Sequence, residues 1–161
     1  MSKVYVYTRN SNAEAFEKGS SRETQIKKCT NYASIKDLTI DEIVEEQCSG
    51  TIPFERREKA FELLKKLKSN DHIICSHLDR FCRNTLSLLQ MIQRFKKKKI
   101  SLHFVDLNCE VTGGDAIGTV FLTMLGCFAQ FQAEQTSQKI KSYRERMRSE
   151  NKFSGGKMTF G

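Results

Sequence analysis

The residues best placed to do chemistry are Arg9 and Ser11, which stand two positions apart just after an apolar and aromatic run. A second polar cluster, Leu78-Asp79-Arg80-Phe81-Cys82-Arg83, directly follows another apolar run. Guanidinium groups match the geometry of phosphate oxygens and stabilise the negative charge that develops on them during phosphoryl transfer. A serine hydroxyl is a weak nucleophile at its ordinary pKa and needs to be activated. The two clusters together favour attack by Ser11 on a phosphate, whereas Ser11 taken alone would be interpreted as the start of a turn.

Other kinds of catalytic site have little support in the sequence. There is no G-x-S-x-G elbow, P-loop or H-E-x-x-H motif, and no acidic cluster suits two metal ions. The histidines His72, His77 and His103 lie in strand-like runs, so a Ser-His-Asp triad is poorly supported. The six cysteines form no C-x-x-C pair, which argues against a zinc ribbon.

Strands and helices alternate along the first two thirds of the chain, which is typical of an α/β fold with a mainly parallel sheet. Apolar runs predict strands at 3–8, around Ile43-Val44 within 38–45, at 72–78 and at 100–107. Helical periodicity predicts helices at about 23–35, 56–68 and 84–98. Because both polar clusters follow strands, they reach the carboxyl edge of the sheet, where open parallel sheets bind ligands. The clusters meet there if their two strands are neighbours.

The last third of the chain predicts one long helix with two different halves. Apolar side chains recur at spacings of four and three, as in a coiled-coil seam, at Ile117, Phe121, Met124, Phe128 and Phe131. The helix then turns basic, with Lys139, Lys141, Arg144, Arg146 and Arg148. One interpretation packs the first half on its own sheet and leaves the second half solvated. In the other interpretation, the first half pairs with another subunit and the second half contacts DNA phosphates.

Length and charge limit the remaining possibilities. The chain has 161 residues, which indicates one domain. Its net charge of +8 and pI near 9.2 favour a polyanionic partner, nucleic acid before membrane, although on charge alone a soluble protein that is simply basic fits as well. No signal peptide precedes the first strand, and the apolar runs are judged too short to span a bilayer. We therefore expect a cytoplasmic protein with reduced cysteines.

In order and spacing, these motifs resemble the catalytic domain of the serine recombinase (resolvase/invertase) family. The family's Y-x-R-x-S is matched by Tyr7-Thr8-Arg9-Asn10-Ser11, and its L-D-R-L-x-R by residues 78–83. Further matches are Gln25 in the first helix, the Ser49-Gly50 loop, Arg57, with Arg56 as the second choice, and Asn70-Asp71. The resemblance covers essentially the whole chain, and the Gly-rich tail is similar to the linker of large serine recombinases. It divides the chain into a catalytic core at 1–112, a long helix with its loop at 113–150, and a linker at 151–161 toward an absent DNA-binding region.

The resemblance also implies a fold and a reaction. The fold is a three-layer α/β/α domain followed by the long helix. The reaction is site-specific DNA cleavage and religation through a covalent 5′-phosphoserine, with no metal and no cofactor. Dimers would join through the long helix and pair into a tetramer on double-stranded DNA.

The site residues follow from the same resemblance. Ser11 would be the nucleophile, and Asp79 would orient the arginines or assist proton transfer. The phosphate would be bound by Arg9, Arg57, Arg80 and Arg83. Supporting roles would fall to Tyr7, Gln25 and Lys139.

Two positions depart from the family's pattern. Asn10 stands where valine is common, and Gln138-Lys139 stands where a Glu-Arg pair is frequent. Lys139 keeps the positive charge but not the guanidinium fork. An alternative hypothesis is therefore a non-catalytic DNA-binding relative of the same fold. A third is a phosphatase-like or nuclease-like hydrolase, which has no water-activating base in its favour.

Overall fold

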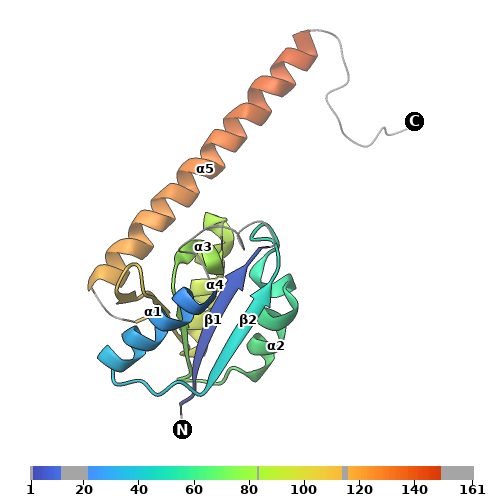
Figure 1. The fold of residues 1–161 in the computed structure, drawn as a ribbon. Helices are drawn as coiled ribbons and strands as arrows, with labels where there is room; N and C mark the ends of the chain where they lie inside the picture. The colour runs from blue at the N-terminus through green and yellow to red at the C-terminus, as the bar shows by residue number, and fades with distance from the viewer. Residues whose placement is uncertain (1, 12–21, 83, 114–115, 150–161) are drawn as a thin grey trace. The chain divides into compact units, whose positions relative to one another are not determined.

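The computed structural model of the chain describes residues 2–11, 22–82, 84–113 and 116–149 (Figure 1). The predictions for Arg83, for residues 12–21 of the first loop and for the tail at 151–161 lie outside the described residues. The elements run in the order β1 (Val4–Asn10), α1 (Arg22–Ile35), β2 (Glu42–Gln47), the 3₁₀ turn η2 (Phe54–Arg56), α2 (Glu58–Lys66), β3 (His72–Cys75), α3 (Leu78–Phe81), α4 (Thr85–Lys98), β4 (Ser101–Phe104), β5 (Cys109–Glu110) and α5 (Ala116–Ser149).

The strands form one sheet in the order β2-β1-β3-β4-β5. Neighbouring strands among the first four run parallel, and β5 pairs with β4 in the antiparallel direction. This confirms the predicted mainly parallel α/β fold. The central pair is β1 and β3, with Tyr7 opposite Cys75. The two strands that precede the polar clusters are therefore neighbours, which was the condition for the clusters to meet.

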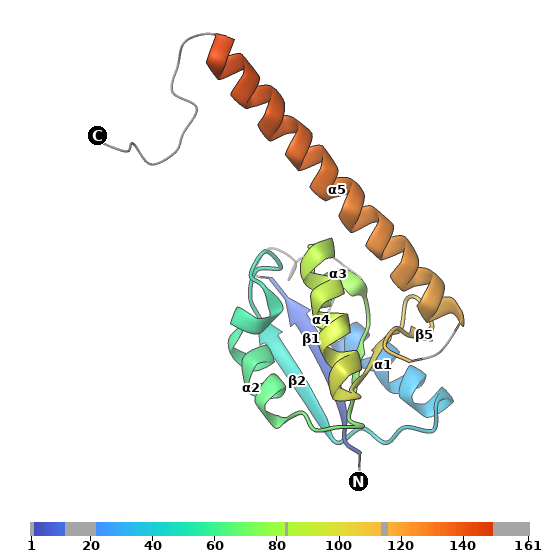
Figure 2. The same ribbon diagram turned by 180° about the vertical axis from the view of Figure 1, so that it is seen from behind.

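Helices cover both faces of the sheet, because successive strand residues point to opposite sides. On one face Val4, Val6 and Ile74 pack with Cys29 and Tyr32 of α1. The other face carries the larger core, in which Tyr5, Tyr7, Ile73 and Cys75 pack with side chains of α2 and α4. Figure 1 shows α1 in front of the sheet, and Figure 2, from behind, shows α2 and α4 over the other face. The predicted three-layer arrangement is confirmed.

Some predicted elements differ from the structure at their ends, and one short strand was not predicted. The predicted strand at 72–78 ends at Cys75, because Leu78 already begins the one-turn helix α3. The predicted helix at 56–68 begins at Glu58, since the 3₁₀ turn η2 follows Pro53 and ends at Arg56. The short strand β5 was not predicted, because two residues carry no periodic signal.

The long helix α5 spans Ala116–Ser149 as predicted, and its first turns belong to the compact unit that ends at Leu125. Phe121, Leu122 and Leu125 pack against the larger core. Gly118 makes this approach possible, because a Cβ atom there would lie 2.4 Å from the carbonyl oxygen of Glu110. A side chain at this position would collide with the backbone.

From Gly126 onward α5 belongs to a second unit, in which most side chains are exposed. Four seam residues along the whole helix are large and exposed, namely Ile117, Met124, Phe128 and Phe131. The basic residues Lys139, Lys141, Arg144, Arg146 and Arg148 are exposed as well.

One sequence expectation about α5 needs correction. The helix has no charged residue from Ala116 to Ala133, so by length and composition alone it could cross a membrane. The expectation that every apolar run is too short for a span is therefore wrong. A single such helix is weak evidence for a membrane segment, because the mostly buried core helix of a soluble protein passes the same test; 6% of this window is buried.

Candidate active site at the carboxyl edge of the sheet

The two polar clusters meet at the carboxyl edge of the central strands. Ser11 directly follows β1, and α3 follows β3 after two residues. From β1 the chain crosses to β2 on one side, whereas β3 lies on the other side, so the strand order reverses between β1 and β3. Crevices at such reversals are where open α/β sheets bind their ligands. The sequence prediction of a shared edge is confirmed.

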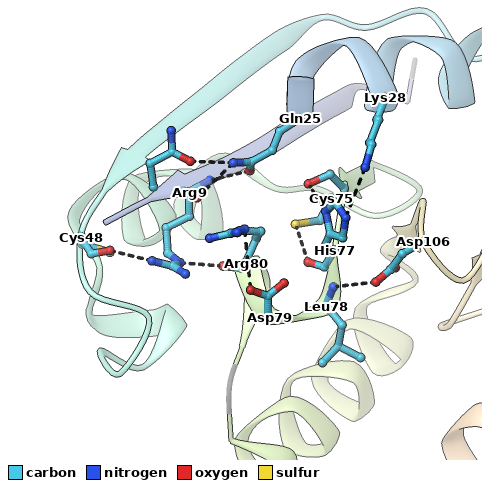
Figure 3. A network of polar contacts seen from close by, with 12 residues as sticks. Arg9, Gln25, Lys28, Cys48, Cys75, His77, Leu78, Asp79, Arg80 and Asp106 are labelled. Atoms are coloured by element: carbon cyan, nitrogen blue, oxygen red, sulfur yellow. Dashed lines mark hydrogen bonds and ion pairs between the residues drawn. The ribbon is translucent and has the colours of Figure 1, made fainter. Parts of the chain in front are cut away.

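Arg9 is the last but one residue of β1, and its side chain is fully buried. Its Nη1 donates to the carbonyl oxygen of Cys48 at 2.9 Å, and its Nε lies 3.3 Å from that of Arg80 (Figure 3). The guanidinium thus joins the loop after β2 to the start of α3. Two segments that are distant in sequence are held beside the end of β1.

Arg57 precedes the first turn of α2 and is only 2% exposed. Its Nε donates to the carbonyl oxygen of Ile52 at 3.0 Å. Its Nη1 donates to the hydroxyl of Tyr7 at 3.0 Å and to the carbonyl oxygen of Arg80 at 2.9 Å. All of these acceptors are neutral, so within the described residues no ion pair compensates the charge of Arg57. A buried cation without a counter-charge is costly, which favours the arrival of an anion.

Tyr7 accepts a hydrogen bond from Arg57 and stays protonated. Burial raises the pKa of the Tyr7 phenol well above its ordinary value, and the nearby Arg57 charge only partly opposes this. The ring packs edge-on against Phe54 and Phe81, with centroids 5.0 and 6.4 Å away. Tyr7 is therefore a neutral, rigid acceptor that orients the Arg57 guanidinium.

Gln25 of α1 holds the end of β1 in place. Its Oε1 accepts from the Arg9 N–H at 3.3 Å, and its Nε2 donates to the Asn10 Oδ1 at 2.6 Å (Figure 3). The same Nε2 lies 3.4 Å from the Arg9 carbonyl oxygen. Gln25 is buried, so these bonds fix the last two residues of β1 immediately before Ser11. Asn10, which departs from the family's usual valine, uses its side-chain oxygen in this network.

Asp79 and Arg80 lie in the single turn of α3, and their side chains form a long ion pair. Asp79 Oδ2 lies 3.7 Å from Arg80 Nε, and the two side chains are 49% and 12% exposed. The Leu78 N–H donates to Asp106 Oδ2 at 3.4 Å, which ties α3 to the turn after β4. Arg80 therefore takes part in the site in two ways. Its side chain lies beside Asp79, and its carbonyl oxygen is the acceptor that Arg9 and Arg57 share.

Sequence reasoning missed Glu46, a buried carboxylate on β2. It accepts from the main-chain N–H groups of Lys59 at 3.3 Å and Ala60 at 2.9 Å, so it caps α2 from another element. The cap fixes the helix start that carries Arg57. A local capping signal could not reveal it, because the acceptor comes from a distant strand rather than from the residue before the helix.

His77 and Lys28 form a second contact that the sequence did not indicate. Lys28 Nζ lies 3.5 Å from His77 Nε2, and His77 Nδ1 lies 3.0 Å from Ser76 Oγ (Figure 3). A lysine ammonium can only donate, so in this contact Nε2 of His77 is on the accepting side. This contact adds a lysine of α1 to the cations near the start of α3.

The fold and this edge define an open α/β protein whose ligand-binding edge is cationic and carries a serine. Comparison with known proteins gives the family. The chain belongs to the resolvase family, since the family model "Resolvase, N terminal domain" matches residues 4–153.

Individual relatives agree with this assignment. A resolvase of Clostridium perfringens is 28% identical over 130 residues, which are 80% of this chain and 66% of that protein. A putative DNA recombinase of Bacillus subtilis is 29% identical over 144 residues, which are 88% of this chain but only 27% of that protein. The N-terminal catalytic domain of TP901-1 integrase superposes with a TM-score of 0.70 at 25% identity, over 83% of this chain and 98% of that domain. The chain thus spans about two thirds of the first relative and a much smaller part of the second.

Proposed function

We propose that this chain is the catalytic part of a serine-type site-specific DNA recombinase, and that Ser11 is its nucleophile. The observation that carries the proposal is the buried Arg57, held by neutral acceptors at the edge where Ser11 follows β1. Membership of the resolvase family supports a reaction on DNA. The match to a small part of a longer recombinase supports a catalytic domain within a large serine recombinase.

In the proposed reaction the Ser11 Oγ attacks a backbone phosphorus. The new Ser11 O–P bond forms as the bond from phosphorus to the 3′ oxygen breaks. The serine proton is lost and the 3′ oxygen gains a proton, so the products are a 5′-phosphoserine and a free 3′-hydroxyl. A 3′-hydroxyl from another strand then attacks the phosphoserine and releases Ser11. The phosphodiester is conserved, because no water takes part.

The arginines would act through charge and geometry. We assign Arg9, Arg57, Arg80 and Arg83 to the phosphate and its developing negative charge. Asp79, 3.7 Å from Arg80, would orient that guanidinium or assist proton transfer. Tyr7 and Gln25 would act as positioning residues through their bonds to Arg57 and to the end of β1. Lys139 would assist from α5.

The assembly is proposed on the same grounds. The exposed seam residues of α5 would pair two subunits, and two such dimers would form a tetramer on double-stranded DNA. Lys141, Arg144, Arg146 and Arg148 would contact phosphates. The division of the chain at 112/113 and 150/151 into core, long helix and linker belongs to this proposal, as does the cytoplasmic location.

Strand cleavage by variants tests the proposal. Wild-type protein and its Ser11→Ala variant are incubated with supercoiled DNA that carries the recombination site flanking the gene. We expect Ser11→Ala to abolish cleavage and to bind DNA nearly as well as wild type. Ser34→Ala, at an exposed serine near the end of α1, is the control and should still cleave. Cleavage by Ser11→Ala would overturn the proposal.

Two outcomes would favour the other candidates. DNA binding by wild type with no adduct would indicate a non-catalytic relative, the hypothesis that the Gln138-Lys139 departure favours. Cleaved ends that carry no protein would indicate a hydrolase.

A further inference from the structure

A second group of cations lies on the opposite edge of the sheet, where the parallel strands begin. We call it the lysine edge and define it by Lys3, Lys66, Lys68 and Lys96–Lys99, all of which are exposed. Lys3 precedes β1, Lys66 ends α2 and Lys68 follows it. Lys96–Lys98 end α4, and Lys99 is its C-cap. The candidate active site lies at the carboxyl ends of the same strands, so the two cationic regions occupy opposite edges of one sheet.

Main-chain contacts bring these lysines together. Asp71 is buried, and its two carboxylate oxygens accept from the N–H groups of Lys3 at 2.9 Å and Lys68 at 2.8 Å. The Asn70 N–H donates to the Lys99 carbonyl oxygen at 2.7 Å. The turn before β3 is therefore bonded both to the start of β1 and to the turn before β4. The cluster is a fixed product of the fold rather than a run of adjacent residues.

The lysine edge carries seven ammonium groups against three carboxylates, those of Asp41, Glu42 and Asp71. Glu42 pairs with Lys66 at 2.7 Å, and Asp71 is occupied by the main-chain N–H groups. Within the described residues no carboxylate forms an ion pair with Lys3, Lys68 or Lys96–Lys99. A hollow of about 440 Å³ opens here, lined by Lys3, Tyr5, Glu42, Lys66, Lys68 and Asp71. Among the described residues that line the hollow, Lys3 and Lys68 are thus the lysines outside any ion pair, and Lys96–Lys99 add four ammonium groups to the same edge.

We propose that the lysine edge binds the phosphates of a double-stranded DNA segment other than the one held at the candidate active site. Ammonium groups on flexible stems are point charges that suit phosphate contacts without reading bases. A second copy of this chain is disfavoured, because a symmetric contact would place lysine against lysine. The choice of DNA as the polyanion rests on the proposed function. The proposal does not depend on the chemistry of Ser11.

The direct test is acylation of the lysines of the full chain. The reaction is run with and without a saturating amount of a short DNA duplex of arbitrary sequence, and the modified lysines are identified by mass spectrometry. We expect Lys3, Lys68 and Lys97 to become severalfold less reactive with the duplex. Exposed Lys27 and Lys36 of α1 serve as internal controls and should react as before. Protection confined to Lys139 and Lys141 would overturn the lysine edge while leaving the proposed function intact. Protection by higher protein concentration without DNA would indicate contact between copies and would also overturn it.

A charge-matched pair of variants provides a second readout. Lys3→Gln/Lys68→Gln/Lys97→Gln removes three charges from the lysine edge, and Lys27→Gln/Lys36→Gln/Lys59→Gln removes three from exposed positions elsewhere. Each phosphate that a protein neutralises adds about 0.9 to the slope of log affinity against log salt concentration. We expect the first variant to flatten that slope by about 0.9 for each phosphate that it no longer neutralises, and the control to change it much less. Equal slopes in the two variants would contradict the proposal.

Discussion

Arg9 and Arg57 converge on one acceptor, the main-chain carbonyl oxygen of Arg80, at 3.3 and 2.9 Å. The first arginine comes from β1 and the second from the start of α2, so the shared oxygen fixes three segments relative to one another. Because the contact uses backbone rather than a carboxylate, it orients the guanidinium groups without cancelling their charge. An arrangement of this kind keeps positive charge at the carboxyl edge for an incoming phosphate.

Arg57→Lys tests this arrangement against a matched neighbour. A lysine cannot bond Ile52, Tyr7 and Arg80 at once, so buried acceptors are left unpaired. We expect the free energy of unfolding to fall by about 1–3 kcal/mol in chemical denaturation. The control Arg56→Lys alters an exposed neighbour and should shift it by less than about 0.5 kcal/mol. Equal effects of the two substitutions would refute the role given to Arg57.

Gln25→Glu tests whether the amide holds the end of β1. A carboxylate cannot donate to Asn10 Oδ1 or to the Arg9 carbonyl oxygen, and would face both as an acceptor. We expect a loss of about 1–3 kcal/mol in stability, together with a large loss of cleavage, because Ser11 follows these residues. Gln90→Glu on the exposed side of α4 is the control. Full cleavage by Gln25→Glu would show that the network does not position Ser11.

The Tyr7 phenol predicts an alkaline limit to stability. Its pKa is raised in the folded protein, so above about pH 10 the folded state holds more protons than the unfolded state. The free energy of unfolding of wild type should therefore fall as the pH rises past about 10. At neutral pH the free energy of unfolding of Tyr7→Phe should be lower than that of wild type, because Arg57 loses an acceptor. Above about pH 10 it should fall less steeply than that of wild type. Parallel declines would contradict this assignment.

Tyr143→Phe provides the reference for that comparison. It removes the hydroxyl of an exposed tyrosine on α5, where no buried acceptor is lost. We expect it to change the free energy of unfolding at neutral pH by less than about 0.5 kcal/mol.

Two glycines of α5 should respond in opposite directions to alanine. At Gly118 a Cβ would lie 2.4 Å from the Glu110 carbonyl oxygen, so Gly118→Ala must displace backbone and should cost about 1–3 kcal/mol. At Gly126 a Cβ would meet nothing within 4 Å, so Gly126→Ala should stabilise the helix by up to about 1 kcal/mol. Thermal and denaturant unfolding measure both. A neutral Gly118→Ala would show that the close approach to β5 does not occur.

Much of the fold could be predicted because its signals are local. The alternation of apolar runs indicated the order of four strands and three helices, and the positions of Arg9, Ser11 and Asp79 after strands placed them at one edge. The adjacency of β1 and β3 remained a condition in the sequence, since strand order depends on tertiary packing. The one-turn helix α3 and the strand β5 are too short to produce a periodic pattern.

The contacts that organise the site could not be predicted for the same reason. The Arg80 carbonyl oxygen is a backbone atom, and the sequence carries no information on which side chains reach it. Glu46 caps a helix that begins in another segment, so its role appears only once β2 and α2 are packed. The roles of the residues, by contrast, come from the resemblance and remain predictions for all of the assigned side chains.

The most direct measurement of the central claim is the mass of the protein after reaction with DNA. The protein is incubated with DNA carrying its recombination site, denatured, and digested with nuclease and protease. Our account predicts a nucleotide remnant on the peptide that bears Ser11, and none on the peptides that bear Ser49 or Ser76. A remnant on another residue, or cleaved DNA with no remnant on any peptide, would contradict it.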